Sequence, residues 1–103
     1  MSKNEDNKES FLEYFSKQGI SLSLALSVYD DIYNGHLFKR PVNPGDDLYK
    51  MHGIVDEDLD DLIIEIAEAN NLKVPLNTDY WQNPVTTIED MIFFIASFSP
   101  KDN

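Results

Sequence analysis

Five carboxylates gathered within six positions near the middle of the chain have the spacing best suited to chemistry. They are Asp56, Glu57, Asp58, Asp60 and Asp61. Carboxylates at alternate positions also begin the calcium-binding loop of an EF-hand. Counted from Asp56, however, the sixth position is Asp61 where that loop needs glycine, and the twelfth is Ala67 where it needs glutamate. We therefore expect no calcium site.

No other group of residues indicates catalysis. Paired carboxylates act as acid and base only in a cleft that moves their pKa values apart, and no motif predicts such a cleft. His36 and His52 lie on separate loop segments without the spacing of metal ligands, and we expect both at the surface. The chain has no cysteine, and none of its eight serines lies in a nucleophile elbow. The sequence therefore predicts a protein that is not an enzyme and that holds no metal ion or cofactor.

The charge of the chain favours a basic partner. Its 103 residues include 19 acidic and 8 basic side chains, which gives a formal net charge of −11. Nucleic-acid binding is not expected, because it needs clustered basic residues and the only adjacent basic pair is Lys39 and Arg40. A large negative charge instead favours encounters with positively charged protein surfaces. We expect the five carboxylates, together with Trp81 in a later loop, to contact a basic protein.

Neither a membrane segment nor a secretory signal is indicated. The longest strongly apolar run, Met91–Phe98, is too short to cross a bilayer. Residues 1–8 are polar or charged after the first methionine and lack the apolar stretch of a signal peptide. We expect a cytoplasmic protein with a disordered leader at 1–8 and a single helical domain at 9–103. Nothing in the sequence specifies an oligomeric state.

Hydrophobic periodicity predicts an all-α fold, a small antiparallel helical bundle with a long second loop. We expect helices at residues 9–18, 21–34, 57–72 and 86–98, of which the first is an extra helix preceding the other three. One segment is ambiguous, because at residues 20–29 five aliphatic side chains alternate with Ser21, Ser23, Ala25, Ser27 and Tyr29, as in a half-buried strand. Helix is favoured there, since only the helical pattern continues beyond this segment and no second clear strand is available as a partner.

Residues that start and stop helices support these boundaries. Ser21 is placed to cap the second helix and Gly35 to end it. Thr86 and Glu89 have the spacing of a capping box at the start of the last helix. The apolar residues that recur at helical spacing define the expected core, which comprises Leu24, Val28, Ile32, Leu62, Ile63, Ile66, Val74, Ile88, Met91, Ile92 and Ile95.

The order of these motifs resembles that of an acyl carrier protein over about residues 24–96. In that family a loop with a DLG-like end leads into Asp-Ser-Leu at the start of the second helix, that helix ends near Ile-Pro, and a Thr-Thr-Val-Glu-Asp-like cap opens the last helix. The corresponding stretches here are Asp47-Leu48, Gly53-Ile54, DEDLDDL from Asp56 to Leu62, Val74-Pro75, and TTIEDMI from Thr86 to Ile92. Asn70 stands where a carrier protein usually has a core phenylalanine. The resemblance implies a carrier-like helical bundle with an added N-terminal helix.

The serine that carries the phosphopantetheine arm in this family has no counterpart in the chain. Counting back from Pro75 places it at Asp56, whereas counting from the neighbouring Asp or Leu of the motif places it at Glu57 or Asp58. Each alternative is a carboxylate, which offers no hydroxyl for modification. The chain is also similar to a bacterial family of acyl-carrier-like domains of unknown function that has an acidic motif at this position. The resemblance therefore implies a protein-interaction module without a prosthetic arm.

A second hypothesis uses the same charges for another purpose. A small acidic helical protein can serve as an immunity protein, which neutralises a basic toxin by occupying the electrostatic site of the toxin's substrate. Both hypotheses expect an acidic protein-binding surface, and they differ in the partner. A neighbouring toxin gene would favour immunity, whereas neighbouring lipid or polyketide biosynthesis genes would favour the carrier-like module.

Overall fold

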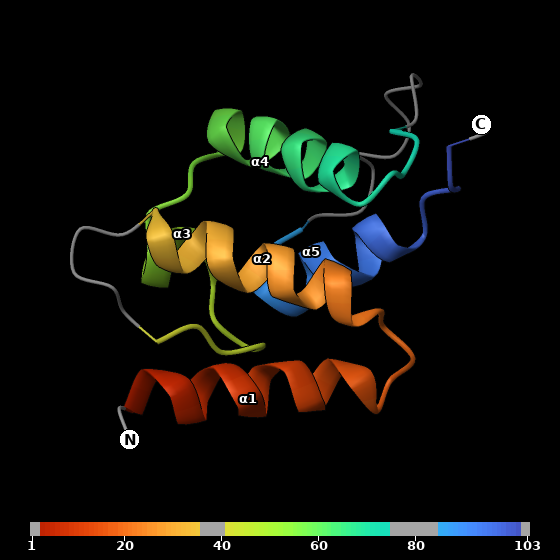
Figure 1. Cartoon of the computed structure of the whole chain (residues 1–103). Helices are drawn as coiled ribbons and strands as arrows, with labels where there is room; N and C mark the ends of the chain where they lie inside the picture. Colours follow the sequence, from red (N-terminus) through yellow and green to blue (C-terminus); the bar gives the residue numbers. More distant parts are fainter. Residues whose placement is uncertain (1–2, 36–40, 75–84, 102–103) are drawn as a thin grey trace.

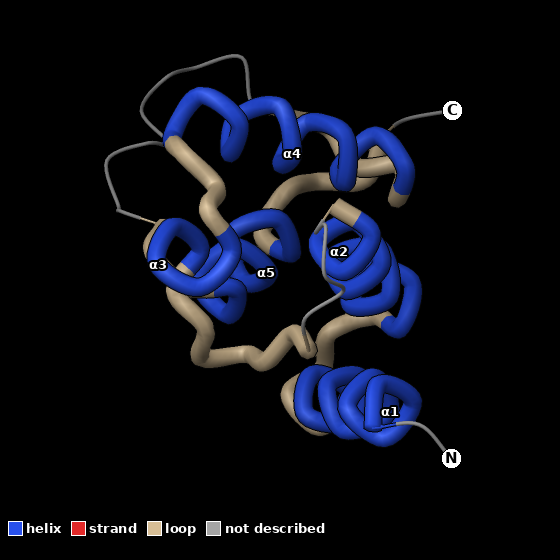
Figure 2. The backbone as a smooth tube through the Cα atoms, turned by 90° about the vertical axis from the view of Figure 1, so that its left-hand side faces the viewer, coloured by secondary structure: helices blue, strands red, loops and turns tan. Residues whose placement is uncertain are grey.

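The described part of the chain folds into five helices arranged in three layers. The computed structural model describes residues 3–35, 41–74 and 85–101. The helices are α1 (Lys3–Ser16), α2 (Leu22–Asn34), α3 (Leu48–His52), α4 (Asp56–Ala69) and α5 (Ile88–Ala96). α1 and α4 form the outer layers, and α2 and α5 lie between them (Figure 1 and Figure 2). The described residues contain no β-strand, so the all-α bundle expected from the sequence is confirmed.

The ambiguous segment after the first helix folds as α2. Ser21 has an extended backbone, and its Oγ accepts a hydrogen bond of 3.1 Å from the backbone N–H of Leu24. At the other end, the N–H of Gly35 donates to carbonyls of the last turn. Both residues therefore cap the helix as predicted. The helical interpretation of this segment is confirmed from Leu22 onward.

α5 lies at the centre of the hydrophobic core. Its four core side chains, Ile88, Met91, Ile92 and Ile95, are 0% exposed. The expected core residues are all buried except Leu62 and Val74, which are partly buried at its edge. The core also includes residues outside that expected set, namely Phe11, Phe15, Ala25, Tyr29, Val42, Leu48, Leu59, Ala67 and Phe98.

The start of α5 is capped one residue later than predicted. Thr87 Oγ1 accepts from the N–H of Asp90 at 3.1 Å, and the Asp90 carboxylate accepts from the N–H of Thr87 at 3.1 Å. The capping box is therefore Thr87 and Asp90, and the predicted pair of Thr86 and Glu89 is wrong. The reason is that Thr86 precedes the helix, where its carbonyl accepts from the N–H of Leu48 at 2.8 Å.

Asp46 joins the loop before α3 to both α3 and α5. Its carbonyl accepts from the N–H of Ile88 at 3.0 Å, and another carbonyl of the same loop binds the next amide of α5. Its carboxylate oxygen Oδ2 accepts from the N–H of Asn43 at 2.9 Å and lies 2.9 Å from Nε2 of His52. Helical amides that have no partner within α5 are thus bound by the loop. We call this set of contacts the Asp46 junction.

α1 is longer than the sequence predicts. It begins at Lys3, so residues 3–8, which we expected in a disordered leader, are helical instead. A polar contact helps to hold this half of α1 in place, because Asn7 Oδ1 accepts from the hydroxyl of Tyr29 at 2.7 Å and from the N–H of Val42 at 3.0 Å. Hydrophobic periodicity cannot reveal such a contact. α4 differs at its other end, since it stops at Ala69 and not at residue 72.

Aromatic packing holds the second half of α1. The ring of Phe11 lies 5.2 Å from that of Tyr29 on α2, and the ring of Phe15 lies 6.1 Å from that of Phe93 on α5, between ring centroids. Phe11 and Phe15 are 1% and 0% exposed. α1 is therefore an integral layer of the bundle.

This packing predicts that Phe15→Ala destabilises the protein by about 3–5 kcal/mol, because it leaves a cavity between α1 and α5. Chemical denaturation followed by far-UV circular dichroism would measure the change. Tyr49→Ala is the control, since Tyr49 is 65% exposed and its truncation should cost less than about 0.5 kcal/mol. Equal losses in the two variants would contradict the placement of α1.

Candidate functional site

The five carboxylates identified in the sequence form the exposed beginning of α4, and we call them the acidic start (Asp56, Glu57, Asp58, Asp60 and Asp61). The N-cap of α4 is Val55, which contributes no side-chain cap. The positive end of the helix dipole favours carboxylates in this first turn. None of the ion pairs formed within the described segments involves the acidic start. All five of its side chains are exposed.

The acidic start has two sides. Asp58 and Asp61, together with Glu65 one turn later, line a groove between α4 and the C-terminal end of α2. Their spacing of three and four residues places them along one side of the helix. The other carboxylates of the acidic start are exposed but do not line the groove.

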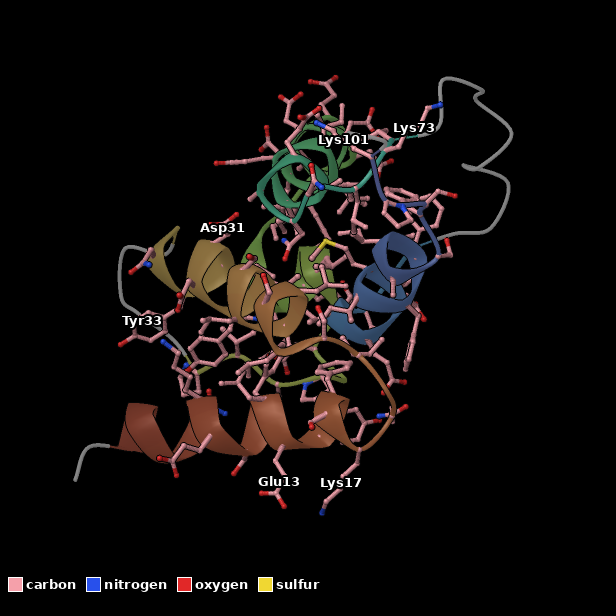
Figure 3. All side chains as sticks on the ribbon, turned by 45° about the vertical axis from the view of Figure 1, so that its right-hand side comes forward. Glu13, Lys17, Asp31, Tyr33, Lys73 and Lys101 are labelled. Atoms are coloured by element: carbon pink, nitrogen blue, oxygen red, sulfur yellow. The ribbon has the colours of Figure 1, made fainter. Side chains whose placement is uncertain are left out.

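The groove combines apolar and acidic linings in a volume of about 240 Å³. Ile32, Ile54 and Leu62 form its apolar part, and all three pack on or within the hydrophobic core. Asp31 joins the groove from α2, and Figure 3 shows it on the side of α2 toward α4. Among the described residues, no lysine or arginine lines the groove. The groove therefore suits a cation that also carries an apolar portion.

The arrangement of the groove perturbs the carboxyl group of Asp31. Burial raises the pKa of its carboxyl group above the ordinary value, and the carboxylates of Glu65 and Asp30 raise it further. Asp31 also lies in the last turn of α2, which has no basic residue, and the negative end of a helix dipole disfavours an anion there. Asp31 and Glu65 were not predicted as site residues; for Asp31, an acidic residue near the C-terminal end of a helix was a detectable signal.

His52 is not at the surface, so that prediction is wrong. Its side chain is 1% exposed and lies against the carboxylate of Asp46, which is 12% exposed. It also lines the groove. The short helix α3 turns His52 inward, and Gly53 ends that helix in a left-handed conformation with φ 67°. The signal in the sequence that could have predicted this inward turn was a glycine placed to end a helix after a short apolar stretch.

Asn70 ties α4 to α2. Its Oδ1 accepts from the hydroxyl of Ser23 at 2.6 Å, and its Nδ2 donates to Ser27 Oγ at 3.1 Å and to the carbonyl of Ile66 at 2.8 Å. Where the resemblance leads one to expect a core phenylalanine, this chain therefore has a polar connection between two layers. The pairing satisfies a partly buried amide and helps to fix α4 beside α2.

Two of the residues considered in the sequence, Trp81 and His36, lie outside the described residues. Within the described segments no cluster of three or more potential ligands could hold a metal ion. A search of the same segments finds no helix both long and apolar enough to span a membrane.

Comparisons with known proteins give no match: no family model fits the chain, and no curated protein or solved structure is significantly similar to it. The resemblance to acyl carrier proteins thus rests on the motifs quoted above and stays a prediction. What the structure defines is a small helical protein with an acidic groove beside an exposed acidic helix start.

The environment of Asp31 predicts that Asp31→Asn stabilises the protein by about 0.5 kcal/mol at pH 7, which raises the thermal midpoint by about 2–4 °C. The pKa is raised in the folded state, so the native protein favours the protonated carboxyl and loses stability as pH rises through that pKa. The advantage of the variant should accordingly disappear in acid, where Asp31 is already neutral.

Asp30→Asn is the matched control for this measurement by differential scanning calorimetry. Asp30 forms an ion pair of 3.0 Å with Lys8, so its neutralisation should bring no gain in stability. An equal rise in both variants would mean that net charge, and not the groove, sets the effect.

Proposed function

We propose that this chain is a non-enzymatic, acyl-carrier-like interaction module of the cytoplasm that presents its acidic start to a basic protein surface. The observation that carries the proposal is that five clustered carboxylates are exposed and take part in none of the ion pairs within the described segments. Such a surface accelerates encounter with a positively charged partner and selects against acidic ones. The net charge of −11 has the same effect over a longer distance and makes nucleic acid an unfavourable ligand.

The carrier-like part of the proposal is supported by where its motifs fall. Asp47 caps α3, the acidic motif opens α4 at Asp56, and Thr87 opens α5. No hydroxyl-bearing residue occupies positions 56–62. The proposed module therefore has no attachment point for a phosphopantetheine arm at the place where the resemblance would put it.

Charge reversal tests the proposed binding surface. Asp58→Lys combined with Asp61→Lys should weaken capture of a basic protein at least tenfold at low salt, because it replaces attraction by repulsion. The difference should shrink toward about 0.5 M salt, where screening is strong. Binding would be measured by biolayer interferometry with the captured partner after purification.

Glu9→Lys combined with Glu13→Lys is the matched control, because it changes the net charge equally on α1. Figure 3 shows Glu13 extending from the outer side of α1, away from the other helices. This control should retain most of the affinity. If both pairs weakened partner binding equally, or if neither pair weakened it, the acidic start would not be the binding surface. A captured nuclease toxin would assign the same surface to immunity.

The absence of a prosthetic arm is tested by co-expression with a broad-specificity phosphopantetheinyl transferase, followed by intact mass spectrometry. We expect the unmodified mass, since carboxylates stand at Asp56, Glu57 and Asp58. An acyl carrier protein expressed in the same way is the positive control. An adduct on this chain would overturn the proposal and make it a working carrier.

A further inference from the structure

The groove between α2 and α4 has the dimensions of one long side chain. Its volume of about 240 Å³ lies below the range of about 300–1,000 Å³ that is usual for small-molecule pockets. It is open to solvent along its acidic edge, where Asp58, Asp61 and Glu65 are exposed. A side chain reaching in from a bound protein fits this shape better than a cofactor does.

The groove separates its apolar and acidic parts in a way that matches a cationic side chain. Ile32 is 4% exposed, and Ile54 and Leu62 are partly buried, so these three present an apolar surface. An aliphatic stem can lie on such a surface while its charged end stays among polar groups. The charged end would meet Asp31 and Glu65, which are close enough for their charges to interact.

Two acidic residues that line the groove, Asp31 and Glu65, repel one another in the free protein. Asp31 is disfavoured as an anion by burial, by Glu65 and by the last turn of α2. A cation bound beside these two carboxylates would remove this repulsion. Gly35 also lines the groove at the carbonyl end of α2, where a positive charge is favoured.

We propose that the groove binds one arginine side chain of the basic partner, with the guanidinium group between the carboxylates of Asp31 and Glu65. The aliphatic stem then lies on Ile32, Ile54 and Leu62. Arginine fits better than lysine, because its planar group can bind two carboxylates at once and is less strongly hydrated. The inference rests on the proposed function and names the chemical group that the partner inserts.

The test uses acetyl-Ala-Arg-Ala-amide as the probe, titrated into the full chain and followed by ¹H–¹⁵N NMR. We expect saturable shifts of the amides of Gly35, Ile54 and Leu62. The citrulline tripeptide, which has the same shape without the charge, should shift none of them. The lysine tripeptide should bind several-fold more weakly.

Two double variants with the same net charge separate the groove from the general acidic surface. Asp31→Asn with Glu65→Gln should raise the Kd of the arginine peptide about tenfold, as expected for the loss of a charge-assisted hydrogen bond. Glu57→Gln with Asp60→Asn should leave the Kd within about twofold, because neither residue lines the groove.

Four results would overturn the inference: no saturable shift, equal binding of citrulline, equal binding of lysine, or equal weakening in the two double variants. If the peptide fails but charge reversal on α4 still weakens partner capture, the groove inference falls and the proposed function stands. If the peptide binds as expected while charge reversal leaves partner capture unchanged, the proposed function falls and the groove remains an arginine site.

Discussion

The Asp46 junction is the contact on which the rest of the structure depends. It supplies hydrogen-bond acceptors to the first amides of α5, the helix whose side chains fill the core, and it receives His52 from α3. Because His52 is fixed, the left-handed turn at Gly53 and the path of Ile54 are fixed with it. That path determines where α4 begins. The position of the acidic start therefore depends on the Asp46 junction, although none of the five carboxylates takes part in that junction.

Two neighbouring helix ends of this protein have opposite electrostatic effects on negatively charged side chains. The first turn of α4 favours carboxylates, whereas the last turn of α2 disfavours them, and yet Asp31 lies in that turn and Asp30 directly precedes it. Asp30 is compensated by Lys8 on α1, and Asp31 has no such ion pair within the described segments. Local placements that oppose stability are expected at functional positions. The electrostatic cost at Asp31 therefore supports a binding role for the groove that it lines.

The sequence predicts this fold better than it predicts the groove. Hydrophobic periodicity and capping residues predicted the positions of α2, α4 and α5. The periodicity arises because apolar residues face one core, and Ser21 and Gly35 have strong local preferences for helix ends. The first half of α1 was missed since Asn7 holds it by polar contacts to residues distant in sequence. The groove was missed for a related reason. It is made by α2 facing α4, and no local pattern in either helix specifies that pairing.

The layered arrangement gives the molecule two unlike outer sides. One is α1, attached to the middle layer through Asn7, Phe11 and Phe15, and the other is α4 with its acidic start (Figure 1). A sensor surface or fluorophore attached to the outer side of α1 would leave α4 facing the solution. Attachment through α4 would instead hide the acidic side. The protein can thus be oriented on a surface by the choice of helix alone.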